Sequence, residues 1–60
     1  MTVNEMLRKL KQDGWYIIGQ KGSHMQLKHD LKKGKVTVPN HKGDIPIFVL
    51  NSILKQAKLK

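Results

Sequence analysis

The sequence contains no cysteine and no apolar run of about 18 residues, the length at which a membrane-spanning helix becomes possible. Without cysteine, disulfide bonds and cysteine-ligated zinc are excluded, which is compatible with a reducing compartment. The first residues also lack the basic-then-apolar order of a signal peptide. These absences favour a cytoplasmic protein without a membrane partner.

Acidic residues are scarce. Four Asp and Glu stand against twelve Lys and Arg, which gives a formal net charge of +8. Residues 31–60 carry seven of the basic residues and only one acidic residue. Such a chain attracts polyanions through counterion release, and its pI of about 10.1 is typical of nucleic-acid-binding domains. An anionic membrane, an acidic protein partner and a merely solvated lysine-rich surface are the alternatives.

The length predicts one small domain over residues 1–60. A domain of this size buries only about 60% of the surface that its unfolded chain exposes. It has no room for a deep, closed cavity. A substrate would therefore lie on the surface, which suits a polymer better than a small metabolite.

Two stretches, residues 2–12 and about 47–58, have the apolar i, i+3, i+4, i+7 repeat of an amphipathic helix. Thr2 and Glu5 are spaced as a capping box at the start of the first helix. Gly14 can end it in the left-handed conformation. We expect the tail after the second helix to fray.

Between the helices, β-branched, aromatic or alternating residues predict three strands. These are Trp15–Ile18, Ser23–His29 and Lys35–Val38, joined by a turn at Gly19–Gly22 and a polar connection at Asp30–Gly34. The short links favour an antiparallel sheet, and both helices must bury their apolar stripes on one of its faces. The predicted fold is therefore α+β, with α-β-β-β-α order and two helices on one face of a three-stranded sheet.

Period-2 alternation assigns the strand side chains to two faces, although a one-residue slip in register would exchange them. Trp15 is expected at the edge of the core. The predicted core is Val3, Met6, Leu7, Leu10, Ile17, Met25, Leu27, Val36, Val38, Leu50, Ile53 and Leu54. The predicted open face carries His24, Gln26, Lys28, Lys35 and Thr37.

His24 is the candidate for acid–base chemistry, because histidine ionises in the range that such catalysis needs. RNA supplies its own nucleophile, the 2′-hydroxyl, so one base and nearby cations could suffice without a metal. Lys21 and Lys28 can supply charge, Ser23 a hydrogen bond, and Gly22 a close backbone approach to phosphate. Taken alone, an ordinary surface histidine remains the simpler interpretation.

The other histidines are His29 and His41. Carboxylates are few, and no histidine pair has the i, i+4 spacing of a zinc protease motif, so we expect no metal site. His41 follows Pro39 in a loop, where it could form loop hydrogen bonds, contact RNA or assist His24. The spacing of Gly19 and Gly22 resembles the clamp loop of KH domains, but strands rather than helices flank it here.

The chain resembles the HicA toxins, the small mRNA interferases of HicA–HicB toxin–antitoxin pairs. The likeness spans nearly the whole chain and rests on several motifs together. They are Gly14-Trp15, Gln20-Lys21-Gly22-Ser23-His24, Val36-Thr37-Val38-Pro39-x-His41 and Leu50-Asn51-Ser52-Ile53-Leu54-Lys55-Gln56-Ala57.

The resemblance implies a double-stranded-RNA-binding-domain-like fold and a metal-independent endoribonuclease without a cofactor. Its members cleave mRNA, which blocks translation, with the histidine of Gly-Ser-His, here His24. A HicB-type antitoxin masks that histidine and links the complex to DNA, so contact with DNA is only indirect. With these implications, the expected RNA-contacting residues are Lys21, Gly22, Ser23, Gln26, Lys28 and His41.

The chain departs from the family pattern in two places. Members often carry Arg where Gly19 stands, so one cation expected near the active site is missing. Many begin the second helix with Gly-Thr, where this chain has Phe48-Val49, and a lost Thr cap costs about 1 kcal/mol. The resulting apolar segment is Ile45, Ile47, Phe48 and Val49. We expect it to pack into the core, with an exposed patch covered by the antitoxin as the alternative.

Two other functions remain open. The chain could be a non-catalytic RNA-binding module of the double-stranded-RNA-binding-domain type, or a basic protein whose main role is to bind an acidic partner. Cleavage of RNA distinguishes the toxin from both.

Overall fold

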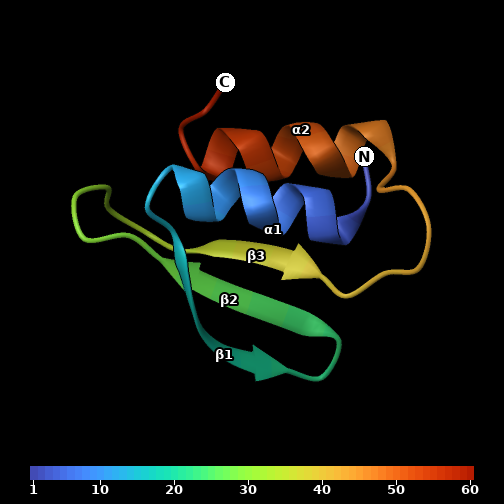
Figure 1. The fold of residues 1–60 in the computed structure, drawn as a ribbon, viewed down its shortest axis with the longest axis horizontal. Coiled ribbons are helices and arrows are strands. Elements are labelled where there is room, and N and C mark those ends of the chain that lie inside the picture. The colour runs from blue at the N-terminus through green and yellow to red at the C-terminus, as the bar shows by residue number, and fades with distance from the viewer.

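The computed structural model describes all 60 residues and has the predicted α-β-β-β-α order (Figure 1). The three strands form one antiparallel sheet in the order β1-β2-β3. Neither helix is long and apolar enough to cross a membrane. The elements are α1 (Val3–Gln12), β1 (Tyr16–Lys21), β2 (His24–Lys28), β3 (Val36–Pro39) and α2 (Ile47–Gln56).

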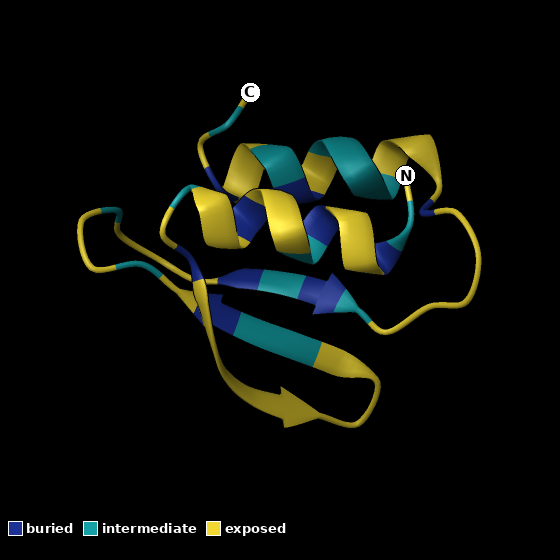
Figure 2. Cartoon of the chain, in the orientation of Figure 1, coloured by how far each residue is buried: buried dark blue, intermediate teal, exposed yellow.

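Both helices lie on one side of the sheet. Figure 1 shows α1 and α2 side by side and running in the same direction, with β3 nearest to them and β1 farthest away. The buried residues follow the inner faces of the helices and of β2 and β3, whereas every residue of β1 is exposed (Figure 2). The core is Val3, Met6, Leu10, Trp15, Leu27, Val36, Val38, Ile45, Ile53 and Ala57.

The predicted core is wrong at Ile17, which is 41% exposed. Alternation places Ile17 on the helix-facing side, opposite Leu27, but the helices do not extend over β1. Trp15 was expected at the edge and is instead 2% exposed, with its ring packed edge-to-face on His29 at a centroid distance of 5.2 Å. Trp15 is therefore the last buried residue before β1, and the chain leaves the core directly after it.

The first hairpin is tighter than predicted. A turn was expected at Gly19–Gly22, but β1 continues to Lys21, and the loop is only Gly22 and Ser23. Gly22 has φ +60 whereas Ser23 does not have positive φ, as in a type II′ turn. This turn keeps both strands paired up to Lys21 and His24.

Both helices end in a Schellman motif. Asp13 is the C-cap of α1, and the next residue, Gly14, has φ +105. In α2 the corresponding left-handed residue is Lys58, with φ +58. The next amide, that of Leu59, donates to the Leu54 carbonyl at 2.9 Å, and the Leu59 side chain packs against the core. The expected fraying after α2 is therefore wrong, since the motif and this packing hold the tail.

The apolar segment before and within the start of α2 divides into two parts. Ile45 is buried and Val49 is half-buried, as a packing role predicts. Ile47 and Phe48 are 67% and 74% exposed, so the expectation that they pack into the core is wrong. Pro46, at the N-cap, provides no side-chain hydrogen bond to the helix.

Candidate functional site

His24 begins β2, immediately after the hairpin turn. Its Cα pairs with that of Lys21 on β1 and with that of Pro39 on β3, so it sits between both neighbouring strands. The Gln20 side-chain amide donates to the Gly22 carbonyl at 3.0 Å and braces the turn. A Cβ built on Gly22 would meet no atom within 4 Å, so positive φ, rather than space, accounts for the glycine.

The imidazole of His24 is exposed, and no group of the protein hydrogen-bonds to it. The turn beside it is held from the β3 side, because the Asn40 amide donates to the Ser23 carbonyl at 2.5 Å. The backbone on both sides of His24 is therefore fixed while its ring is free to meet a ligand.

A β-bulge in β1 decides which side chains share the face of His24. The pairing with β2 shifts between Ile17 and Gly19, so Ile18 is the extra residue. In a regular strand, residues an odd number of positions apart point to opposite faces. Tyr16 and Lys21 are such residues, yet the bulge resets the alternation and places both on the open face.

The sheet face turned away from the helices is hereafter called the open face. Directly opposite residues of antiparallel strands share a face and lie about 4.5–5.5 Å apart at Cα. The prediction that His24, Gln26, Lys28 and Thr37 occupy it is confirmed, whereas Lys35 lies just outside β3. The cross-strand pairs of this face are Tyr16–Lys28, Gly19–Gln26 and Lys21–His24 with β1, and Thr37–Gln26 and Pro39–His24 with β3.

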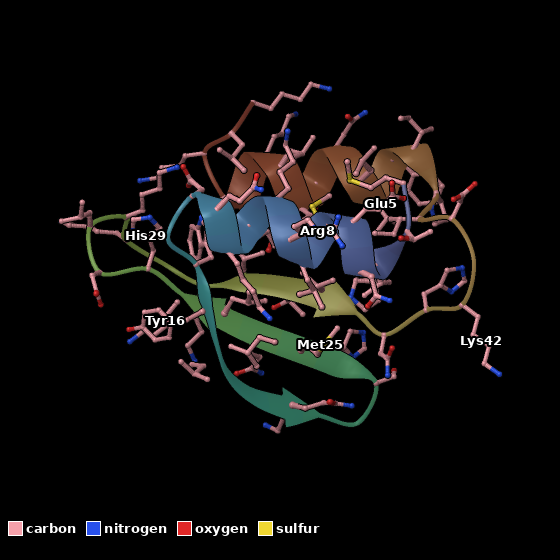
Figure 3. All side chains as sticks on the ribbon, in the orientation of Figure 1. Glu5, Arg8, Tyr16, Met25, His29 and Lys42 are labelled. Atoms are coloured by element: carbon pink, nitrogen blue, oxygen red, sulfur yellow. The ribbon has the colours of Figure 1, made fainter.

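Sequence analysis assigned Tyr16 to neither face of the sheet, and the structure places it on the open face. Tyr16 is 44% exposed, and its hydroxyl donates to the Asp30 carboxylate at 3.2 Å. This hydrogen bond raises the pKa of Tyr16 above its ordinary value, which keeps the phenol protonated. Figure 3 shows Tyr16 at the end of the sheet near His29, away from the hairpin turn. The signal was available, because Ile17 was assigned to the core side and its neighbour in a strand points to the opposite face.

His41 lies in the loop that leaves β3 beside the hairpin turn. The structure fixes this loop at its far end, where the Ile45 amide donates to the Met1 carbonyl at 2.8 Å. Lys42 projects from the same loop (Figure 3). A groove of about 330 Å³ lies between the loop and the start of α1, lined by Thr2, Val3, Asn4, Asn40, His41, Lys42 and Gly43. His41 is thus near the hairpin end of the sheet but not on the open face.

A larger groove of about 460 Å³ lies along α1 and not on the open face. Its lining is mostly polar: Asn4, Leu7, Arg8, Lys11 and Gln12. Because α1 covers the other side of the sheet, this groove does not include His24.

His29 has a structural environment that differs from that of His24. Its ring is only 8% exposed, and Nδ1 accepts hydrogen bonds from the amides of Leu31 and Lys32 at 2.9 and 3.1 Å. Nε2 therefore carries the proton and donates to the Asp13 carbonyl at 2.6 Å. A Cβ on Gly14 would lie 2.7 Å from this Nε2. Both ring nitrogens of His29 are therefore used to join the end of α1 to the β2–β3 connection.

The structure thus brings together Lys21, His24, Gln26 and Lys28 on one face, with Gly22 and Ser23 in the adjoining turn. His41 stands apart in its loop. The chain has no group of three or more His, Cys, Asp or Glu side chains arranged to hold a metal ion.

Comparison with known proteins bears on the family of the chain. A comparison with curated proteins gave no match. The family model described as the HicA toxin of bacterial toxin–antitoxin systems matches residues 3–59, which include all five elements and the open face. The chain therefore belongs to the HicA toxin family.

Proposed function

We propose that the protein is the toxin of a type II toxin–antitoxin system and that it is a metal-independent endoribonuclease that cleaves mRNA at His24. The observation that carries this proposal is the exposed, unpartnered imidazole of His24 with Lys21 directly opposite it. A base that must reach a substrate atom needs a free ring on a rigid backbone. His24 has both, whereas His29 has neither free nitrogen nor exposure.

In the proposed reaction, neutral His24 takes the proton of a ribose 2′-hydroxyl. The 2′-oxygen bonds to the adjacent phosphorus, and the bond from phosphorus to the next nucleotide's 5′-oxygen breaks. That oxygen takes a proton from water, and His24 later returns its proton to solvent. The ends are a 2′,3′-cyclic phosphate and a 5′-hydroxyl. Lys21 stabilises the negative charge that grows on the phosphate oxygens in the transition state.

The remaining contacts of the RNA are assigned by position. Gly22 and Ser23 approach the scissile phosphate from the turn, where the Ser23 hydroxyl is exposed. Gln26 and Lys28 continue the open face away from the cleavage point, and His41 meets the strand where it leaves the hairpin end.

The partner that neutralises the toxin is a HicB-type antitoxin that covers His24. Membership of a toxin–antitoxin family supports an antitoxin partner. The formal charge of +8 favours an acidic surface on it. The toxin would contact DNA only through the antitoxin.

The test is cleavage of mRNA by the purified wild type and His24→Ala, with and without EDTA. Loss of one general base lowers the rate about 10²–10⁴-fold. We expect wild-type cleavage to survive EDTA and to fall by at least about 100-fold in His24→Ala, with an unchanged circular dichroism spectrum. Lys9→Ala is the control, since it removes an exposed side chain from α1, which lies on the other side of the sheet. Full activity of a folded His24→Ala variant would contradict the assignment.

A non-catalytic RNA-binding module is the second candidate. It is favoured by one observation, that no side chain hydrogen-bonds to His24 to orient it. This alternative predicts bound but intact RNA after long incubation, and no growth arrest when the protein is induced alone.

A further inference from the structure

We propose that the open face binds single-stranded RNA and that Tyr16 is a stacking platform for a base of that strand. The inference rests on the proposed function and adds the form of the substrate and a binding residue to it. Tyr16 lies opposite Lys28, on the same face as His24, and is 44% exposed.

The open face is a continuous track between two ends. One end holds His24 and Lys21, and the other holds Tyr16 and Lys28. Four residue steps along β2 separate His24 from Lys28, or about 13 Å at the usual strand rise. A short strand of a few nucleotides spans this distance, with its scissile phosphate at His24 and a base over Tyr16.

The open face combines positive charge with one aromatic ring. Lys21 and Lys28 supply a cation at each end, and between them Gln26 lies beside Gly19, whose missing side chain leaves open space. Single-stranded nucleic acids are bound by this combination of cations that follow the backbone and an aromatic ring that stacks on a base. The hydrogen bond to Asp30 holds the Tyr16 ring in one orientation.

A duplex fits this face poorly. Bases of an A-form helix are stacked on one another and cannot stack on Tyr16, whereas unpaired bases can be splayed onto a protein ring. In-line attack by the 2′-oxygen also requires a nucleotide free to leave A-form geometry, because the reacting atoms must be aligned. Both requirements select a single strand.

The decisive comparison is between Tyr16 and Ile17. The two are neighbours in β1 and almost equally exposed, at 44% and 41%, but they lie on opposite faces of the sheet. Tyr16→Leu removes the ring from the open face, and Ile17→Ala alters the other face. Tyr16→Phe keeps the ring and removes only the hydroxyl, so it tests stacking separately from the bond to Asp30.

Binding is measured by fluorescence anisotropy of a labelled single-stranded 2′-O-methyl RNA, which lacks the nucleophile and stays intact. We expect Tyr16→Leu to weaken binding about tenfold, in the range of base–aromatic stacking, without changing the salt dependence. Tyr16→Phe and Ile17→Ala should stay within about twofold of the wild type. Lys28→Gln should make the logarithmic salt slope shallower by about 0.7, as one lost phosphate contact does.

Three outcomes overturn the inference: equal losses in Tyr16→Leu and Ile17→Ala, tighter binding of the same RNA annealed to its complement, or no binding of the single strand. The proposed function is tested separately, by measuring cleavage of an RNA of the same sequence that has free 2′-hydroxyl groups. If the wild type binds through Tyr16 but leaves that RNA uncut, catalysis fails while the binding track stands.

Discussion

At the scale of single residues, Gly19 is a gap in the open face. It pairs with Gln26, between the Tyr16–Lys28 and Lys21–His24 pairs. A Cβ built there meets no atom within 4 Å, and its φ is not positive, so any L-residue fits without strain. An arginine at this position would therefore place its charge among the residues proposed to bind RNA.

We expect Gly19→Arg to tighten binding of single-stranded RNA several-fold and to steepen the logarithmic salt slope by about 0.7, because it adds one phosphate contact. Anisotropy titrations at several salt concentrations measure both. Ile17→Arg is the control, since Ile17 pairs with Leu27 on the helix-facing side and is 41% exposed. Equal gains from both arginines would mean that net charge, not position on the open face, drives binding.

At the scale of the elements, the two helix ends use the same motif with different residues. Gly14 adopts φ +105 without cost, whereas Lys58 adopts φ +58 with a Cβ that opposes it. The end of α2 is therefore less favourable than the end of α1.

We expect Lys58→Gly to raise the free energy of unfolding by about 0.5–1 kcal/mol, which corresponds to a Tm increase of a few degrees in a domain this small. Lys55→Gly should do the opposite, by about 1 kcal/mol, because Lys55 lies within α2. Thermal and urea melts followed by circular dichroism give both values. A decrease in Lys58→Gly would show that the Lys58 side chain, rather than its backbone strain, matters.

The elements also show what sequence analysis can and cannot predict. Both helices were predicted, because apolar residues such as Leu10 and Ile53 recur at the spacing that places them on one stripe of a helix. The order of the strands was predicted from the short links between them. Alternation correctly assigned His24 and Lys28 to the open face. It could not show that Ile17 would be exposed, because a pattern gives the face of a residue but not how far the helices reach.

The same limit explains the errors around the candidate site. Two glycines at positions 19 and 22 suggested a four-residue turn, although only Gly22 has the positive φ that a type II′ hairpin turn requires. The pairing of His24 with Lys21 and Pro39 depends on contacts between distant strands and has no local signature. The exposure of Phe48 likewise follows from where the core ends, not from its own hydrophobicity.

At the scale of the whole molecule, Lys32 joins three elements. Its Nζ lies 2.5 Å from the Asp13 carboxylate at the end of α1 and 3.0 Å from the Ala57 carbonyl at the end of α2. Lys32 itself belongs to the β2–β3 connection. The hydrogen bond from Lys32 holds the pKa of Asp13 below its ordinary value, and a hydrogen bond from the Thr2 backbone does the same for Glu5.

A carboxyl with a lowered folded pKa stabilises the fold above its unfolded pKa and loses that contribution as the pH falls through its folded pKa. We therefore expect the Tm to be nearly constant around neutral pH and to fall below about pH 4. Asp13→Asn should lower the Tm at pH 7 and flatten the acid dependence. Melts from pH 3 to 7 test this, with Asp44→Asn as control, since the Asp44 side chain is 81% exposed and has only an exposed ion pair with the N-terminal amine at 3.6 Å. An unchanged acid dependence in Asp13→Asn would exclude the joint at Lys32 as its source.

The bulge at Ile18 has a consequence for how this chain is compared with its relatives. Only five of the six residues of β1 pair with β2, so the strand has one residue more than its pairing with β2 needs. A chain that lacked position 18 would keep Tyr16, Gly19 and Lys21 opposite the same partners and would present the same face. In an alignment, a one-residue gap belongs at position 18, and it would signal a straighter strand, not a different site.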